Sequence, residues 1–208
     1  KIVSHDLRSP LNVAEGYLEL EVASDARNRE SQHLVKAKHA IERSQTLIED
    51  LLTLAQAGEQ LDELESMRLV EVAKGCWRTV ETAAATLTVD ATHPNSQTQT
   101  PAIKIEADRS RLKQLLENLY RNAVEHGGDD LTVSVGICED GFYVADTGRG
   151  IPESERKDIF EVGYSTDEVG TGFGLRIVKQ VADAHGWDID VTGSEQGGRG
   201  SNSVAFDL

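Results

Sequence analysis

The sequence predicts an α + α/β protein. A two-helix hairpin, which pairs with a second copy into a four-helix bundle, is followed by an α/β sandwich with a mixed sheet. Apolar residues recur at heptad spacing up to about residue 57, which is typical of packed helices. Beyond residue 68, β-prone and helical runs are segregated rather than strictly alternating, which favours helices packed on a mixed or largely antiparallel sheet. The length of 208 residues accommodates both parts.

Two apolar patterns predict the helices of the hairpin, which spans residues 1–57. The first, up to about residue 24, has apolar residues at steps of four, three and four: Leu7, Leu11, Ala14 and Leu18. The second has one series with a seven-residue repeat and another three positions further on: Leu34, Ile41, Ile48 and Ala55, then Ala37, Ser44 and Leu51. The polar region 24–31 is the expected turn. Because such a hairpin leaves a second apolar strip uncovered, we expect a homodimer through the hairpin.

His5 is the candidate nucleophile of the hairpin. It lies two residues before Leu7, which at 100° per residue places it about 200° from the seam and toward solvent. A neutral exposed imidazole is a good nucleophile, and Asp6 can fix its tautomer by accepting from Nδ1–H. Ser9 shares the outward strip, and Pro10 predicts a bend just past His5. The alternative interpretation is a surface histidine near a kink.

Residues 58–68 interrupt the heptads and are interpreted as a linker, with a short strand as the alternative, and residues 69–208 form a second domain. Asp108 is the expected N-cap of its long helix, and Gly127-Gly128 its stop. Residues 193–201 are expected to be a flexible loop. The patterns predict helices over residues 69–85, 109–126 and about 172–184, and strands over residues 86–89, 103–107, 131–138, 141–146, 187–192 and 203–206.

The stretch from Asp146 to Gly174 predicts a nucleotide pocket with a mobile lid. Asp146 ends a β-prone run and is followed by Gly148 and Gly150, so the backbone turns sharply and can approach a ligand closely. A second glycine cluster runs into an apolar-periodic helix, whose free N–H groups would form an anion site: Gly170, Gly172 and Gly174. Glycine spacing alone is a weak indication, because 18 glycines in the chain produce such spacings by chance.

Asn118 and Asn122 give the pocket a second polar element. They are four residues apart on the long helix and therefore share one face, roughly opposite its leucines. Asparagine is a poor helix former and is costly to bury without partners, so two of them on one line indicate a polar ligand. An amide oxygen is a suitable hard ligand for Mg²⁺. The other ligands of this ion are usually phosphate oxygens of the substrate.

Five motifs of the chain resemble, in the same order, those of two-component sensor histidine kinases. The run Ser4–Leu11 resembles the H box, which carries the phosphoacceptor histidine. The other four resemble the N box, the first glycine box, the F box and the second glycine box: Asn118–His126, Asp146–Gly150, Ile159–Glu161 and Gly170–Leu175. The resemblance implies a dimerisation and phosphoacceptor domain followed by a Bergerat-type ATP-binding fold, as in gyrase and MutL.

The resemblance also implies an activity and roles for individual residues. A histidine autokinase would transfer the γ-phosphate of Mg-ATP to His5 and then pass it to an aspartate of a response regulator receiver domain. Asp6 would assist His5, and Ser9 would position water if the chain also dephosphorylates its partner. Asn122 would hold Mg²⁺, and Asp146 would accept from the adenine amine. The implied ATP-binding residues are Asn118, Asn122, His126, Asp146, Gly148, Gly150, Ile151, Phe160, Gly170, Thr171, Gly172, Phe173, Gly174 and Leu175.

Three departures from the family pattern limit what the resemblance implies. Glu125 and His126 stand where many members have Lys and Tyr. His126 can still stack on adenine, but Glu125 cannot bind phosphate. Ser9 stands where members with phosphatase activity commonly have Thr or Asn. Residues 162–167 form a variant lid, so the lid contacts do not carry over.

Two other functions compete with the kinase. ATPases similar to gyrase and MutL place a general-base Glu four residues before the Mg²⁺ asparagine, but Asn118 stands there in this chain. Glu117 points about 100° away from that position, so hydrolysis is disfavoured. A catalytically silent dimeric adaptor is the second alternative, and the intact N and glycine boxes argue against it.

The composition of the chain bears on its binding partners, its location and the role of its cysteines. The chain has 21 Lys and Arg against 36 Asp and Glu, a net charge of −15 that argues against nucleic-acid or anionic-membrane binding and suits a halophile's cytoplasm. Because no apolar run approaches the roughly 20 residues of a membrane span, this fragment is expected to be cytoplasmic. The chain opens inside a motif without Met, which indicates the end of a longer protein that can carry a membrane anchor upstream. Cys76 and Cys138 are interpreted as buried reduced thiols.

Overall fold

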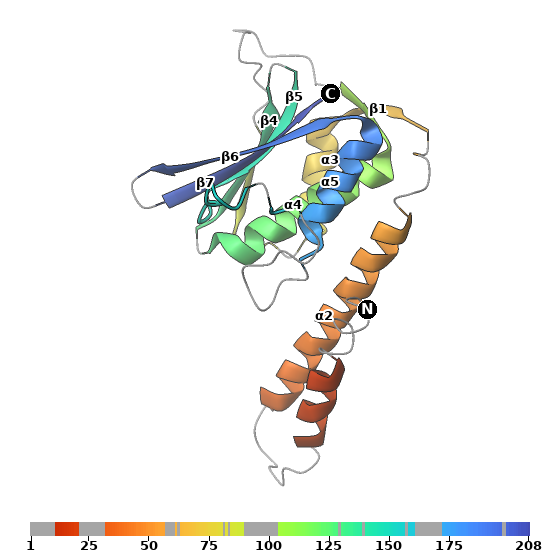
Figure 1. Cartoon of the computed structure of the whole chain (residues 1–208), viewed down its shortest axis with the longest axis vertical. Helices are drawn as coiled ribbons and strands as arrows, with labels where there is room; N and C mark the ends of the chain where they lie inside the picture. The colour runs from red at the N-terminus through yellow and green to blue at the C-terminus, as the bar shows by residue number, and fades with distance from the viewer. Residues whose placement is uncertain are drawn as a thin grey trace.

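The structure, a computed structural model, describes residues 11–20, 32–56, 61, 63–80, 82, 84–89, 104–128, 130–138, 140–156, 158–160, 172–196 and 199–208. A helical hairpin stands at one end of an elongated molecule, and the sheet with its covering helices stands at the other (Figure 1). His5, Asp6, Ser9, Gly170 and Thr171 lie outside the described residues, as does most of the expected lid. Within the described segments, no helix has the length and hydropathy needed to cross a membrane.

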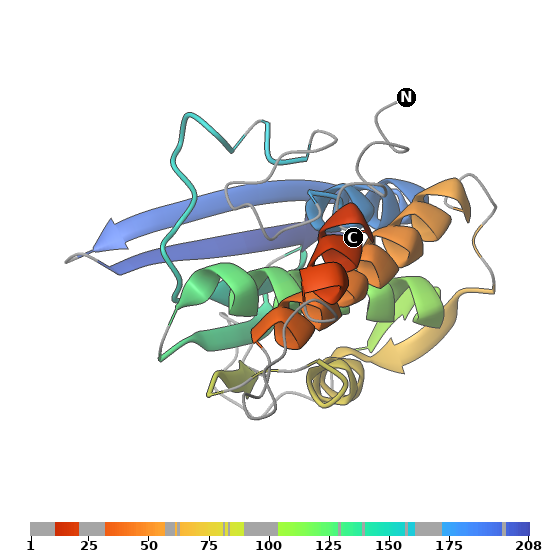
Figure 2. The ribbon, with the colours of Figure 1, turned by 90° about the horizontal axis from the view of Figure 1, so that it is seen from below.

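The hairpin consists of a helix over residues 11–20 and helix α2 (Gln32–Gln56), which lie side by side (Figures 1 and 2). Its buried residues are mostly small: Ala14, Ala37, Ala40, Ser44, Leu47 and Asp50. Ser44 is satisfied within α2, because its Oγ donates to the carbonyl oxygen of Ala40 at 2.9 Å. Small side chains at the contact let the two helices approach closely.

An apolar strip of the hairpin is exposed, as expected, although the heptad pattern does not indicate which residues form it. On α2 it is the series with the seven-residue repeat, and Leu34, Ile41 and Ile48 are 48, 41 and 46 % exposed. Leu11 and Leu18, which were placed in the seam with Ala14, are 51 and 42 % exposed. That part of the prediction is wrong for the single chain, because one hairpin covers only one side of each helix and the two leucines lie outside it.

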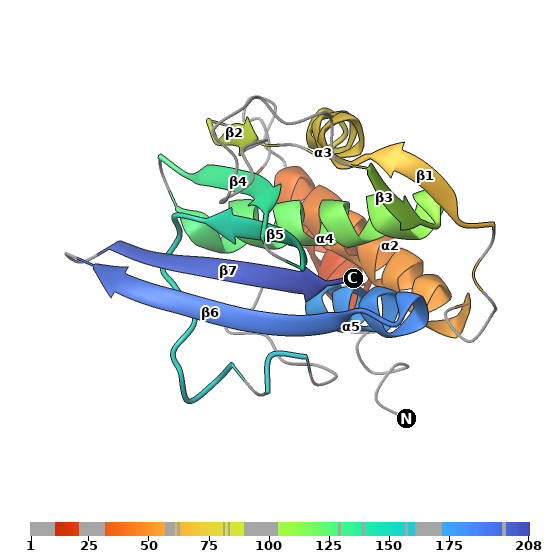
Figure 3. The ribbon, with the colours of Figure 1, turned by 90° about the horizontal axis from the view of Figure 1, so that it is seen from above.

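The second domain is an α/β sandwich with a five-stranded mixed sheet in the order β2-β4-β5-β7-β6. Only β2 and β4 are parallel, and the other neighbours are antiparallel. Helices α3, α4 and α5 pack on one face of this sheet and enclose the core (Figure 3). The bounds are Leu69–Trp77 (α3), Arg109–Gly127 (α4), Gly174–His185 (α5), Thr86–Val89 (β2), Thr132–Ile137 (β4), Gly141–Asp146 (β5), Asp188–Gln196 (β6) and Arg199–Asp207 (β7). The expected fold class is confirmed.

Helix α4 begins and ends at the predicted residues because its signals are local. The Asp108 carboxylate accepts hydrogen bonds from the backbone N–H groups of Ser110 and Arg111, which makes it the N-cap. Gly128 follows the helix at a φ of 79°, a conformation that other residues rarely adopt. The leucine stripe of α4 is buried in the core, including Leu112, Leu115 and Leu116.

His185 ties the C-terminus of α5 to the N-terminus of α4. Its Nε2 accepts from the backbone N–H of Asp108 at 3.0 Å, and its Nδ1 donates to the carbonyl oxygen of Val181 at 2.8 Å. The ring also stacks on Trp187, with centroids 4.2 Å apart. This contact holds the two helices of the expected pocket in one register.

A strand forms at the end of the expected linker. Strand β1 (Glu65–Arg68) pairs antiparallel with β3 (Lys104–Ala107) in a separate two-stranded sheet. The short-strand alternative for this stretch is therefore the one that the structure contains. Arg109 of α4 also contacts β1, with its Nε 3.1 Å from Glu65 Oε2, so the strand belongs structurally to the second domain.

Three local predictions are wrong. The helix expected over residues 69–85 ends at Trp77, because the chain closes a turn there, in which the backbone N–H of Thr79 donates to the Cys76 carbonyl oxygen at 3.1 Å. The loop expected over residues 193–201 is largely paired, with Gly193 opposite Asn202. Backbone hydrogen bonds extend this ladder although the glycine and serine side chains give no strand signal. Cys76 is buried as expected, but Cys138 is only half-buried because it follows β4 at the hairpin turn.

Candidate nucleotide-binding site

Three elements converge at the expected pocket: the C-terminal end of β5, the C-terminal half of α4 and the N-terminus of α5 (Figure 3). Helices α4 and α5 are in direct contact. Strand β5 delivers Asp146, α4 delivers Asn118 and Asn122, and α5 begins at Gly174. The structure thus brings together residues that the sequence places up to 56 positions apart.

The carboxylate of Asp146 is held in place by hydrogen bonds. The backbone N–H of Gly148 donates to Asp146 Oδ1 at 2.7 Å. Gly148 must be glycine, because a Cβ there would lie 2.7 Å from Asp146 Oδ1 and 2.9 Å from Gly127 Cα. Burial raises the pKa of Asp146 above its usual range, while the bonds from Gly148 and Asn202 and the charge of His126 act in the opposite direction.

Asn202 of β7 is a site residue that the sequence reasoning missed. It stands directly opposite Asp146 in the β5–β7 ladder. Its Nδ2 donates to both Asp146 oxygens, at 3.3 Å each. The sequence gives no clear signal for it, because Asn202 lies between Ser201 and Ser203, and its role depends on a strand register that the sequence does not specify.

Asn118 and Asn122 turn their amides toward the start of α5. A Cβ placed on Gly174 would lie 3.0 Å from Asn122 Oδ1 and 3.3 Å from Asn118 Oδ1. Asn118 is 5 % exposed, and its Nδ2 donates to the Gln114 carbonyl oxygen at 2.9 Å. That bond orients the amide and leaves Oδ1 directed at Gly174. Two amide oxygens and a side-chain-free helix start therefore border the same small space.

Glu117 is directed away from this space. Its Oε1 accepts a hydrogen bond at 2.9 Å from the hydroxyl of Thr79, which follows α3. The carboxylate that stands next to Asn118 in the sequence is thus engaged on a different face of α4, about 100° round the helix, as the helical spacing predicts. None of the described contacts places it where it could activate water for attack on a phosphate.

The start of α5 suits an anion. Its N-cap position is Phe173, whose phenyl ring offers no acceptor to the first-turn N–H groups. Gly172, before it, has a φ of 72°, which favours glycine. Phe173 is buried and Leu175 packs against the core, so the helix start is anchored from below. The N–H groups of the first turn and the helix dipole favour a phosphate there.

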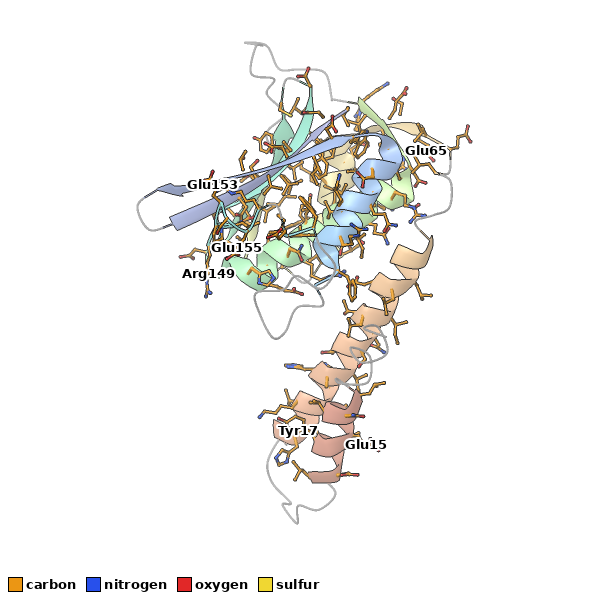
Figure 4. The ribbon with its side chains drawn as sticks, viewed as in Figure 1. Glu15, Tyr17, Glu65, Arg149, Glu153 and Glu155 are labelled. Atoms are coloured by element: carbon orange, nitrogen blue, oxygen red, sulfur yellow. The ribbon has the colours of Figure 1, made fainter. Side chains whose placement is uncertain are left out.

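The segment after the first glycine box is fastened to the sheet by Arg156, which the sequence reasoning did not single out. Its Nε donates to the Ile151 carbonyl oxygen at 3.1 Å, and its Nη2 donates to the Gly193 carbonyl oxygen at 3.2 Å. Gly150 has a φ of 79°. Ile159 is buried and Phe160 is half-buried, so the isoleucine is the more deeply anchored residue of the F box. Figure 4 marks the neighbouring Arg149, Glu153 and Glu155.

The two residues at the end of the N box differ in setting. His126 is half-buried, and its charge acts on both Asp146 and Glu125. Partial burial raises the pKa of Glu125 although the residue keeps an exposed side; His126 and Arg121 lower it, and Asp50 of α2 raises it further. A carboxylate with a raised pKa, near a second carboxylate, is not a phosphate ligand. Helix α2 lies against this domain, where it contacts α5.

The polar groups of this site fit a purine nucleotide that is bound together with a hard cation. Asp146 offers a fixed acceptor for a base amine, and the α5 start offers donors for phosphate. The Oδ1 atoms of Asn118 and Asn122 are neutral oxygen ligands of the kind that Mg²⁺ binds together with substrate phosphates. The space at Gly174 would be filled by a Cβ, which is consistent with a ligand that passes close to the backbone.

The fold and this site define a nucleotide-binding domain joined to a helical hairpin. Residues 107–208 match the family described as "Histidine kinase-, DNA gyrase B-, and HSP90-like ATPase", and residues 1–60 match the "His Kinase A (phospho-acceptor) domain". The chain therefore belongs to the two-component histidine kinases, of which it contains the catalytic core. It includes an ATP-binding domain of that family.

Curated relatives agree with this assignment. The chain is 34 % identical over 196 residues to the sensor histidine kinase ZraS of Klebsiella oxytoca, covering 90 % of this chain and 41 % of ZraS. It is 30 % identical over 199 residues to the sensor histidine kinase YkoH of Bacillus subtilis (strain 168), covering 90 % of this chain and 42 % of YkoH. The chain thus spans less than half the length of these two relatives.

Solved structures share the fold. The Acinetobacter baumannii histidine kinase AdeS matches with a TM-score of 0.69 at 21 % identity, covering 98 % of this chain and 97 % of AdeS. The histidine kinase ThkA in complex with response regulator protein TrrA matches with a TM-score of 0.69 at 19 % identity, covering 99 % and 60 %. Full-length ShkA in complex with AMPPNP matches with a TM-score of 0.61 at 26 % identity, covering 99 % and 45 %.

Proposed function

We propose that this chain is a histidine autokinase that transfers the γ-phosphoryl group of Mg-ATP to His5 and then to an aspartate of a response regulator. The observation that supports the proposal is that Asp146, Asn118, Asn122 and the α5 start all lie around the C-terminal half of α4, in a chain that also matches the phosphoacceptor domain. The domains are residues 1–57 for dimerisation and phosphotransfer and about 65–208 for ATP binding, with the linker between them.

The residues of the pocket position ATP rather than attack it. Asp146 accepts from the adenine amine, and the first-turn N–H groups of α5 hold phosphate oxygens. Asn122, with Asn118 beside it, holds Mg²⁺, which when bound neutralises charge on the phosphates. Phosphoryl transfer needs mainly positioning and charge neutralisation, so these groups suffice once a nucleophile arrives.

An asparagine at position 118 disfavours hydrolysis of ATP and leaves transfer of the phosphoryl group to a side chain as the favoured reaction. A general base for water would have to stand near the Mg²⁺ ligand, and an amide has no proton-accepting capacity at neutral pH. The adjacent carboxylate of Glu117 is engaged by Thr79 at 2.9 Å. Among the described residues, neither position thus offers a base to water, and the γ-phosphoryl group persists until His5 reaches it.

His5 supplies the nucleophile and Asp6 orients it, by the sequence argument. Because His5 belongs to the hairpin and ATP to the second domain, transfer requires a hinge motion in the linker near residues 58–62. The described part of α2 contacts α5, so the two domains touch in the present arrangement. Ser9, one turn after His5, would position water for dephosphorylation of the regulator.

The homodimer forms through the uncovered strip of the hairpin. Leu34, Ile41 and Ile48 lie on one line along α2, and a second copy would cover them. A receiver domain is the partner that the phosphoacceptor hairpin implies, and the ThkA structure contains a response regulator protein. No contact with nucleic acid is expected from a chain of net charge −15.

Radiolabelled autophosphorylation tests the proposal. The purified chain, incubated with Mg²⁺ and ATP labelled in the γ position, should acquire a label that acid removes and base does not. His5→Gln should remove it, whereas His33→Gln, a histidine change elsewhere in the same hairpin, should leave it. Equal labelling of the His5→Gln variant would show that the phosphoacceptor is another residue.

A further inference from the structure

Residues 151–160, which join the first glycine box to the expected lid, have little buried surface. In Figures 2 and 3 the chain leaves the end of β5 and extends past β6, the last strand of the five-stranded sheet on that side. Ile159 is buried, but none of the other described residues of this stretch is. A segment with so few buried contacts has a low local stability, so its position depends on the polar contacts that it makes.

Arg156 joins this stretch to the sheet. Its guanidinium bridges two backbone carbonyl oxygens, that of Ile151 at 3.1 Å from Nε and that of Gly193 at 3.2 Å from Nη2. Ile151 follows Gly150, which has a φ of 79°, and Gly193 belongs to β6. Because the donors of a guanidinium form a rigid planar fork, both acceptors are held in one geometry. The bridge therefore fixes the end of the first glycine box relative to the edge of the sheet.

The turn that carries Arg156 is shaped by its own backbone. The N–H of Glu155 donates to the Pro152 carbonyl oxygen at 2.9 Å, and the N–H of Ile159 donates to the Glu155 carbonyl oxygen at 3.2 Å. These bonds set the direction of the Arg156 side chain without tying the turn to the sheet. The bridge to β6 supplies that tie, on the side of the turn that leads back to the pocket.

We propose that Arg156 is a positioning residue of the nucleotide site, which holds the first glycine box in its binding arrangement before ATP arrives by bridging Ile151 to Gly193. The inference rests on the proposed function and deepens it. The apparent affinity of a site scales with the fraction of molecules in which the site is already formed, and the bridge keeps this fraction high. Once ATP is bound, the ligand itself orders the segment. Loss of the bridge therefore raises the KM for ATP and leaves kcat unchanged.

Two other roles for Arg156 predict different results. If Arg156 only strengthens the fold, its loss lowers the melting temperature but leaves the affinity of the folded protein for ATP unchanged. If its charge binds a phosphate group, lysine at this position restores binding, and the loss of affinity is larger for ATP than for ADP. In the positioning role, lysine does not restore the bridge, because a single ammonium lacks the planar fork, and ADP and ATP are weakened by the same factor.

The test compares the wild type, Arg156→Met, Arg156→Lys and the control Arg78→Met, which removes the same charge from an exposed position after α3. Initial autophosphorylation rates give KM and kcat, and calorimetry gives the affinities for ADP and ATP. Loss of the two hydrogen bonds in Arg156→Met should raise the KM for ATP about tenfold and leave kcat within about twofold. Arg156→Lys should behave like Arg156→Met, and Arg78→Met should match the wild type.

Hydrogen exchange gives a second readout that does not depend on catalysis. The backbone amides of residues 151–160 should exchange faster in nucleotide-free Arg156→Met than in the wild type. Saturating ATP should remove this difference, because the ligand then orders the segment. If Arg156→Met does not fold, Arg156→Gln, which keeps an amide donor, takes its place in every measurement.

An unchanged KM for ATP in Arg156→Met would overturn the inference, and so would a variant whose only defect is a lower melting temperature. Recovery of wild-type KM in Arg156→Lys, or a larger loss of affinity for ATP than for ADP, would assign Arg156 to phosphate binding instead. Each of these results leaves the nucleotide site standing, because the wild type still binds ATP. If the wild type itself binds no ATP, the proposed function fails as well, so the two failures are distinguishable.

Discussion

Gly174→Ala should separate the stability of this protein from its activity. Gly174 is the first residue of α5 and has no side chain between the helix and the two asparagines. An added Cβ would lie 3.0 Å from Asn122 Oδ1 and 3.3 Å from both Asn118 Oδ1 and Asn122 Nδ2. The closest of these contacts is about 0.4 Å shorter than ordinary van der Waals contact, so the Asn122 amide must move.

The two consequences of this substitution have opposite signs. Alanine is the better helix former and restricts the unfolded chain, which stabilises the fold by up to about 1 kcal/mol. For a chain of this size that corresponds to a rise in melting temperature of about 2–4 °C. The displaced amide would misplace the Mg²⁺ ligand, and a shift of this order should lower the autophosphorylation rate about ten- to hundredfold.

Gly75→Ala is the matched control. Gly75 lies within α3, and no atom lies within 4 Å of an added Cβ there. The control should gain similar helix stability and keep wild-type autophosphorylation. Both variants are compared by thermal melting and by initial rates with γ-labelled ATP over a range of Mg²⁺ concentrations. Wild-type rate and Mg²⁺ dependence in Gly174→Ala would refute the placement of Asn122 in the metal site.

Three further outcomes are expected. Burial raises the pKa of Asp146 above about 3.9. The unliganded fold should therefore lose stability as pH rises through the raised pKa, and the affinity for ATP, which needs the ionised carboxylate, should fall as pH drops below it. An ATP-induced melting shift that is flat down to pH 4 would contradict this. Burial raises the pKa of the Cys76 thiol to about 11, so a thiol reagent at pH 8 should label the half-buried Cys138 and spare Cys76 until the protein unfolds, as mass spectrometry can show. Ile41→Glu should dissociate the dimer in sedimentation experiments. His39→Glu, which adds a carboxylate at an exposed position about 160° round α2 from Ile41, should not; equal dissociation would remove the exposed strip from the interface.

The elements that the sequence predicts well are those with local signals. The cap at Asp108 and the stop at Gly128 act within a few residues of the helix ends, so both could be recognised directly. The same holds for Asp146, whose strand and following glycines are contiguous. Helical spacing alone also indicated that Glu117 turns away from Asn118, and the contact with Thr79 agrees.

The features that the sequence did not predict are those that depend on contacts between segments far apart in the chain. Asn202 becomes a site residue only because β7 pairs with β5 in one register, and no local pattern contains that register. The paired stretch around Gly193 looked like a loop because glycine and serine contribute backbone hydrogen bonds but no side-chain signal. Arg156 could not be singled out, since both of its acceptors are backbone carbonyl oxygens.

The central claim is that the γ-phosphoryl group goes to a histidine and not to water. The most direct measurement is the ratio of phosphohistidine on His5 to ADP formed during the first turnover with Mg-ATP, with inorganic phosphate measured in parallel. A kinase without a hydrolytic base should form about one phosphohistidine for each ADP and little free phosphate. ADP and free phosphate released at equal rates, with no change in the His5→Gln variant, would show that the chain is an ATPase.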